Sequence, residues 1–112
     1  MTARPAGPAD VAEPAQVGMQ DFEDFAADPV RVHARQRPHD DAVIEVDSSG
    51  RPAAALTWSE LSRQADRTAA ALLDAGVKPG DVVAYQLPNR IEFVTLSTAV
   101  RRIGAVAWKI SE

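Results

Sequence analysis

Residues 57 to 110 alternate helix-like and strand-like segments with connections of only a few residues, and this order limits the folds open to the chain. Thr57 and Glu60 have the spacing of a capping box, which starts a helix. The apolar face that follows, at spacings of three and four, consists of Leu61, Ala65, Thr68, Ala69 and Leu72. This pattern predicts an amphipathic helix that ends at Gly76.

Two apolar strands are predicted further along, one on each side of a second helix. Residues 78 to 81, Lys-Pro-Gly-Asp, have the composition of a type II turn, and residues 82 to 87 follow as a strand that is apolar on both faces. Asn89 is predicted to cap the second helix, with Glu92 supporting its start. The main apolar stripe of that helix comprises Phe93, Leu96, Val100 and Ile103. Residues 105 to 110 form the next predicted strand.

The N-terminal half is predicted to hold a short helix and a β-hairpin. Asp28 followed by Pro29 is a favourable start for a helix that must stop before Pro38. The hairpin arms are residues 42 to 46 and 53 to 57, joined by a polar turn at residues 47 to 51.

The predicted fold class is α/β. A β-hairpin is followed by a short parallel β-α-β-α-β unit, because strands that alternate with helices over short connections favour right-handed parallel crossovers. A chain of 112 residues corresponds to about one domain. We expect residues 1 to 20, which are rich in alanine and proline, to be a disordered tail that precedes a folded part at residues 21 to 112.

Composition excludes several classes of function. The net charge of -4 weighs against nucleic acid as a partner, and the sequence contains no apolar run long enough for a membrane span. Without cysteine there is no disulfide framework and no cysteine metal site, so the cytoplasm is the expected compartment.

Several side chains suggest a ligand site, but each has a simpler interpretation. His33 and His39 are predicted to be surface histidines, because metal sites usually recruit three or four ligands. Asp40 and Asp41 are interpreted as solvated turn residues, and the Ser-Ser-Gly run at residues 48 to 50 as a plain hairpin turn.

Arg101 and Arg102 fall in the last turn of the second helix, where positive charge compensates the helix dipole without any ligand. Trp58 and Trp108 are predicted to be packing residues rather than stacking platforms. No nucleophile elbow and no acid-base dyad is recognisable, so we name no catalytic, cofactor-binding or metal-binding residue.

Residues 25 to 107 resemble the beginning of the large N-terminal domain of adenylate-forming acyl-CoA synthetases, a superfamily that also holds peptide-synthetase adenylation domains and luciferases. The resemblance rests on the order and spacing of Thr57-Trp58-Ser59-Glu60-Leu61, Gly76 with Lys78-Pro79-Gly80-Asp81, Leu87-Pro88-Asn89, Glu92-Phe93 and Gly104-Ala105-Val106. It implies that the fold is an incomplete portion of that domain. The end of the chain, residues 108 to 112, departs from the family pattern.

The resemblance also implies a chemistry. Family members join a carboxylic acid to ATP, with magnesium, as an acyl-adenylate, and coenzyme A then displaces AMP. Their phosphate loop, ribose-binding aspartate and catalytic lysine lie beyond the point where this chain stops. The six glycines here have no phosphate-cradle spacing, and the lysines are Lys78 and Lys109.

We therefore expect a truncated fragment of an ATP-dependent carboxylic acid-CoA ligase that is inactive alone and self-associates through an exposed sheet edge. ATP, Mg²⁺ and coenzyme A are implied for the full-length enzyme, and no cofactor is expected in the fragment. The alternative is a self-standing small α/β interaction module that binds a partner protein through its unfinished sheet. Downstream DNA discriminates the two, because a fragment predicts an encoded phosphate loop there.

Overall fold

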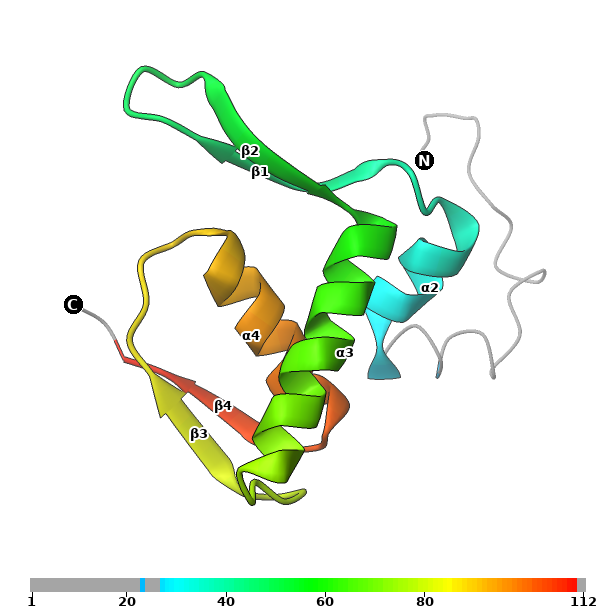
Figure 1. Cartoon of the computed structure of the whole chain (residues 1–112), viewed down its shortest axis with the longest axis vertical. Helices are drawn as coiled ribbons and strands as arrows, with labels where there is room; N and C mark the ends of the chain where they lie inside the picture. Colours follow the sequence, from blue (N-terminus) through cyan, green and yellow to red (C-terminus); the bar gives the residue numbers. More distant parts are fainter. Residues whose placement is uncertain (1–22, 24–26, 111–112) are drawn as a thin grey trace, which may run out of the picture.

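The computed structural model describes residue 23 and residues 27–110, so the predicted tail at residues 1 to 20 lies outside the described residues. The described residues form two small sheets around packed helices (Figure 1). The elements are α2 (Pro29–Gln36), β1 (Asp41–Val46), β2 (Pro52–Thr57), α3 (Trp58–Asp74), β3 (Val82–Tyr85), α4 (Ile91–Arg102) and β4 (Val106–Lys109). Both the α/β class and the predicted order of elements are confirmed.

The strands form two separate pairs. β1 and β2 pair antiparallel, whereas β3 and β4 pair parallel, with Val82 opposite Val106 and Tyr85 opposite Lys109. The parallel crossover is therefore confined to β3, α4 and β4, and the hairpin does not join that sheet. The 17 residues of α3 span about 25 Å at the rise of an α-helix, and β2 and β3 lie at opposite ends of this helix (Figure 1).

The predicted helix starts of α2 and α3 are confirmed. The Asp28 carboxylate accepts a hydrogen bond from the Arg31 amide at 3.0 Å. At α3, Thr57 Oγ1 accepts from the Glu60 amide at 3.1 Å and Glu60 Oε1 accepts from the Thr57 amide at 2.8 Å. Both caps form between residues three apart, which is why the sequence alone predicts them.

The predicted cap of α4 is wrong. The N-cap residue is Arg90, and it makes no side-chain capping bond. The carboxylate of Glu45 on β1 takes this role, accepting from the Ile91 amide at 3.2 Å and pairing with Arg90 Nη2 at 3.1 Å. A cap supplied from another element, 46 residues away, satisfies the helix end without Asn89.

The core lies where α3 and α4 meet. Its buried apolar residues are Leu56, Leu61, Ala65, Ala69, Ala99 and Val100. The predicted face of α3 is confirmed at Leu61, Ala65 and Ala69, with Thr68 and Leu72 half-buried. On α4 the most buried residues are Thr95, Ala99 and Val100. Three members of the stripe predicted for α4, Phe93, Leu96 and Ile103, are only half-buried.

The parallel sheet has one covered and one bare face. Tyr85 packs edge-on against Phe93 of α4, with ring centroids 5.5 Å apart. Val82, Val106 and Trp108 are exposed, and Trp108 retains 63% of its accessible surface. The prediction that Trp108 is a packing residue is therefore wrong for the described residues, because none of the described elements covers this side chain.

The turns around this sheet hold its two strands in register. Gly80 has a φ of +87°, as the third residue of the predicted type II turn requires, and its amide donates to the Gly104 carbonyl at 2.8 Å. Gly104 also has a positive φ of +77° and follows the end of α4. These two glycines join the start of β3 to the start of β4.

Candidate functional site

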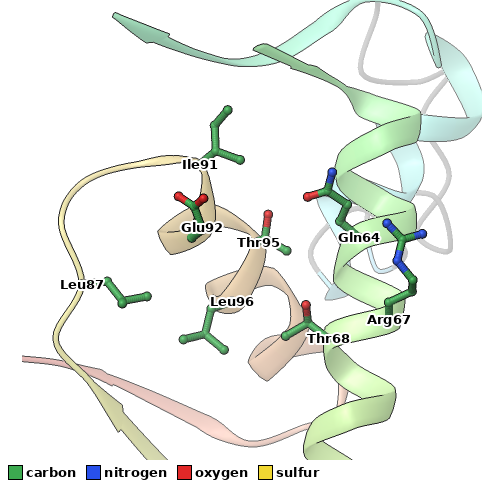
Figure 2. A pocket seen from close by; sticks show the side chains of 8 residues that line it. All are labelled: Gln64, Arg67, Thr68, Leu87, Ile91, Glu92, Thr95 and Leu96. Carbon is green, nitrogen blue, oxygen red and sulfur yellow. The ribbon is translucent and has the colours of Figure 1, made fainter. Parts of the chain in front are cut away.

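A cleft of about 470 Å³ lies between α3 and α4 (Figure 2). Gln64, Arg67 and Thr68 line it from α3. The opposite wall is formed by Leu87 of the β3–α4 loop and by Ile91, Glu92, Thr95 and Leu96 of α4. Polar groups therefore dominate the α3 wall, and apolar groups dominate the wall formed by the loop and α4.

Thr95 is the most buried residue of this cleft, with 7% of its surface exposed. Its hydroxyl has no hydrogen-bond partner among the residues that the structure describes. Thr98, one turn later in α4, differs because its hydroxyl donates to the Val94 carbonyl at 2.8 Å. A buried hydroxyl without a partner costs about 1–3 kcal/mol, so the Thr95 hydroxyl, which is shielded from solvent, lowers the stability of this part of the fold.

Charged side chains stand on opposite walls of the cleft. Arg67 of α3 and Glu92 of α4 are both exposed. Within the described part of the chain neither forms an ion pair. The lining of the cleft therefore includes one exposed cationic and one exposed anionic side chain.

The lining of the cleft lacks several residue types that commonly act as nucleophiles or general bases. Its lining contains no Ser, Cys or Lys nucleophile and no histidine. Lys78 lies in the turn before β3, and Lys109 Nζ lies 4.9 Å from the centre of the Phe93 ring. Across residue 23 and residues 27–110, no three metal-ligating side chains cluster closely enough to hold an ion.

A cluster of charged side chains holds α2 against α3 and α4. Arg102 Nε donates to Asp28 Oδ2 at 2.8 Å, and Nη1 donates to Asp66 Oδ1 at 2.9 Å and to the Ser62 carbonyl at 2.7 Å. Arg31 completes the cluster, with its Nη2 3.3 Å from Asp66 Oδ1.

The Arg102 side chain is 5% exposed, so it is buried by tertiary contacts. Dipole compensation alone therefore does not account for Arg102, whereas Arg101 is exposed at the helix end as predicted. Sequence reasoning missed this role because the partners of Arg102 lie 36 to 74 residues away.

The Asp28 carboxyl is held in its charged form by these contacts. Burial by itself raises its pKa, but hydrogen bonds from the Arg31 amide and the Arg102 guanidinium, together with the charges of both arginines, outweigh burial and lower the pKa below 3.8. Asp28 therefore serves as a helix cap and as the counter-ion of a buried arginine.

The two histidines differ in their surroundings. His33 is half-buried, and its ring lies against Trp58 with ring centres 4.5 Å apart and a tilt of 40° between the rings, which confirms packing for Trp58. His39, Asp40 and Asp41 are exposed.

The hairpin turn at residues 48 to 50 is confirmed. The Asp47 carboxylate accepts hydrogen bonds from the amides of Ser49, at 2.8 Å, and Arg51, at 3.0 Å. These contacts lower the pKa of Asp47, with the hydrogen bond from the Ser49 hydroxyl as the largest cause. The turn therefore uses its own acidic side chain where an external anion would bind.

The chain belongs to the AMP-binding enzyme family, whose sequence model matches residues 30–111. It is 43% identical over 75 residues to triostin synthetase I of Streptomyces triostinicus, covering 67% of this chain and 14% of that protein. Salicylyl-CoA synthase / salicylate adenylyltransferase of a Streptomyces species is 42% identical over 73 residues, covering 65% of this chain and 12% of that protein.

Solved structures agree with this family membership. Acetoacetyl-CoA synthetase from Streptomyces lividans matches with a TM-score of 0.70 and 36% identity, over 76% of this chain and 13% of that chain. The chain thus spans 12% to 14% of the length of these curated relatives and corresponds to a short N-terminal region of adenylate-forming ligases. None of the helices in the described residues is long and apolar enough to cross a bilayer.

Proposed function

We propose that this chain is a scaffold segment of an ATP-dependent carboxylic acid-CoA ligase and that it forms no acyl-adenylate by itself. The observation that carries the proposal is the family match over residues 30–111, together with the fold shared with acetoacetyl-CoA synthetase. ATP, Mg²⁺ and coenzyme A would then be requirements of the whole ligase, and the acid and nucleotide would bind outside the described residues.

The N-termini of the two longer helices, α3 and α4, support the proposal that the nucleotide binds outside the described residues, because neither N-terminus fits a nucleotide phosphate. The N-terminus of α3 is closed by Thr57 and Glu60, and that of α4 by the Glu45 carboxylate. A phosphate placed at either end would meet a carboxylate already bound to the free amides. At these two helix starts, a capping carboxylate therefore already lies where a phosphate group would bind.

Three finer expectations belong to the same proposal. The isolated chain self-associates through the β3–β4 sheet, and the whole protein works in the cytoplasm, in keeping with the lack of cysteine. Residues 21 to 112 form the folded part, with residues 1 to 20 as its tail.

The test combines the isolated chain with a chimera. The isolated chain should exchange pyrophosphate into ATP no faster than a protein-free blank with any of a panel of carboxylic acids. In the chimera, residues 30–111 replace the matching segment of the Streptomyces salicylyl-CoA synthase, and salicylate-dependent exchange is measured. A scaffold role predicts that a folded chimera keeps at least about one-tenth of the parent rate, a loss of roughly 1.4 kcal/mol in barrier or less.

Exchange by the isolated chain contradicts the proposed division of labour. A chimera that folds, binds ATP and yet shows no exchange contradicts the scaffold role. A chimera of the same relative carrying an unrelated α/β segment of equal length serves as the control, and it should be inactive.

A further inference from the structure

We propose that the β1–β2 hairpin is a hinged arm and that the Glu45 carboxylate is the latch that holds this arm against the start of α4. The inference concerns a motion within the described residues, so it depends neither on the ligase role nor on what covers the surface of the chain. It rests on where the hairpin is attached, on the two contacts of Glu45, on the irregular strand that carries Glu45, and on the open space beside that contact.

The hairpin is attached to the helices at one end. Its second strand ends at Thr57, and α3 begins at the next residue, Trp58. At this base the Trp58 amide donates to the Asp40 carbonyl and the Ser59 amide donates to the Pro38 carbonyl, both at 3.0 Å. The two strands pair with each other, and no third strand of the described residues joins them. Beyond its base the hairpin projects away from α3 (Figure 1). A motion about the base therefore moves the hairpin as one body and keeps the hydrogen bonds between its strands.

Glu45 joins the projecting part of the hairpin to α4. Its Oε1 accepts a hydrogen bond from the Ile91 amide at 3.2 Å, and its Oε2 lies 3.1 Å from Arg90 Nη2. The Glu45 side chain is 19% exposed, whereas that of Arg90 is 62% exposed. Hydrogen bonds to a charged acceptor are stronger than neutral ones, and a helix N-terminus favours negative charge. Because one carboxylate makes both contacts, losing its charge weakens both together.

The strand that carries Glu45 turns an acidic side chain inward. Its neighbours Ile44 and Val46 are 54% and 56% exposed. The pairing of β1 with β2 is irregular between Asp41 and Val43 and again between Glu45 and Val46. Irregularities of this kind change the direction of nearby side chains. Burial of Ile44 and Val46 therefore does little to fix the hairpin in its present position, and the contacts of Glu45 take this role.

Open space beside Glu45 leaves the hairpin room to move. A hollow of about 230 Å³ lies between β1 and the start of α4, and its lining includes Val43, Ile91 and Val94. Closely packed elements restrain one another because few voids remain between them. This contact lacks such close packing. Ile91 also lines the α3–α4 cleft, so an arm that moves away from Ile91 uncovers part of the cleft lining.

Distances between two spin labels test the latch. The sequence contains no cysteine, so Ser48→Cys in the hairpin turn and Ala70→Cys on α3, both at exposed positions, give one labelled pair. The labelled chain is diluted into an excess of unlabelled chain, and pulsed electron paramagnetic resonance then measures distances within one molecule. One narrow distance distribution is expected with Glu45 intact.

Neutralising Glu45 should release the arm. In the labelled pair, Glu45→Gln should add a second population at longer distance, because weakening the charged contact shifts the ratio of closed to open arms by about tenfold. Asn89→Ala is the matched control, since Asn89 lines the same hollow but does not cap α4. It should keep the single distribution. The amide chemical shifts of Ala65 and Ala69 should stay unchanged in both variants, which shows that α3 remains folded.

Salt tests the same latch without a substitution at Glu45. Because Arg90 is mostly exposed, raising the salt concentration to about 1 M, where the Debye length is about 3 Å, should move the labelled pair toward longer distances. Arg90→Met should reduce this response. An unchanged distribution in a folded Glu45→Gln chain overturns the proposal, as does the same release by Asn89→Ala. If Glu45→Gln does not fold, the salt series decides, and a distribution that ignores salt or is already broad at low salt overturns the proposal.

Discussion

Arg102 Nε donates a hydrogen bond to Asp28 Oδ2 at 2.8 Å, and this contact joins the end of α4 to the residue that caps α2, 74 positions earlier in the chain. The same guanidinium reaches the Ser62 carbonyl and Asp66 on α3. One side chain thus fixes three helices to one another. Among the described residues, the large side chains with less than 2% exposure are Leu61 and Val100, so this polar junction adds to a small apolar core.

Replacing Arg102 with methionine should lower the free energy of unfolding by about 2–4 kcal/mol, since Asp28 and the Ser62 carbonyl lose a buried charged partner. Urea denaturation followed by circular dichroism measures the change. The control is Arg101→Met, which alters the exposed neighbour in the same helix turn and should cost less than about 1 kcal/mol. Equal losses for the two variants would mean that helix-end charge, and not the Asp28 contact, is what matters.

The Asp28 contact also predicts how stability depends on pH. Burial raises the pKa of Asp28 and its hydrogen bonds and ion pairs lower it by more, so the folded chain holds this proton less tightly than the unfolded chain does. The resulting stability is present above the ordinary aspartate pKa of 3.8 and is lost as pH falls through the lower folded value. Asp28→Asn keeps a capping side chain but should show a shallower loss of melting temperature between about pH 5 and pH 2. Identical slopes for the two proteins would rule out this linkage.

Glu45 should be the true cap of α4. Glu45→Gln removes the charge that faces Arg90 and the helix start, and it should lower the free energy of unfolding by about 1 kcal/mol, which shifts the melting temperature by roughly 4–8 °C. Asn89→Ala should change it by no more than a few tenths of a kcal/mol. Thermal melts of both variants decide whether Glu45 or Asn89 caps α4. A larger effect at Asn89 would support the local cap that the sequence predicts.

Features set by neighbouring residues could be predicted from the sequence. The capping box of Thr57 and Glu60 and the turn at Gly80 involve residues at most three positions apart, and the structure confirms them. The hairpin turn around Asp47 belongs to the same class.

Features set by contacts between distant residues could not be predicted from the sequence. Glu45, Arg102 and Thr95 each look like ordinary surface or helix-face residues until the elements around them are placed. The one available signal for Thr95 was its spacing of four from the small residue Ala99, which marks the side of α4 that approaches α3. A stripe drawn through large apolar residues alone selects Phe93 and Leu96, which lie toward the sheet and the cleft.

Deleting residues 1 to 20 should shift the melting temperature by less than about 5 °C, because the segment has too few large apolar residues to form a packed face and about 1 kcal/mol corresponds to such a shift in a domain of this size. Differential scanning fluorimetry of the deleted and full chains tests this. A larger fall would show that the segment packs on the folded part.

The bare face of the β3–β4 sheet should drive self-association. Val82 and Val106 are paired across the sheet and are 58% and 50% exposed, respectively. Trp108 lies beside them on β4. Within residues 27–110 no further strand pairs with the outer edges of this two-stranded sheet, so apolar surface and free backbone groups occur together there. Val106→Lys places a charge in the middle of this surface. It should therefore shift the chain toward monomer at tens of micromolar, roughly the range in which partly covered folds associate.

Sedimentation velocity with light scattering measures the distribution of species for the unchanged chain, for Val106→Lys and for Ser48→Lys. Ser48 lies in the exposed hairpin turn, so its variant carries the same charge change away from the sheet and should associate like the unchanged chain. A compact monomer of the unchanged chain, with a cooperative melt well above about 50 °C, within the usual range for a complete small domain, would contradict both self-association and the scaffold role. It would favour the self-standing interaction module instead, because a chain that is stable with its sheet uncovered does not need the rest of a ligase to fold.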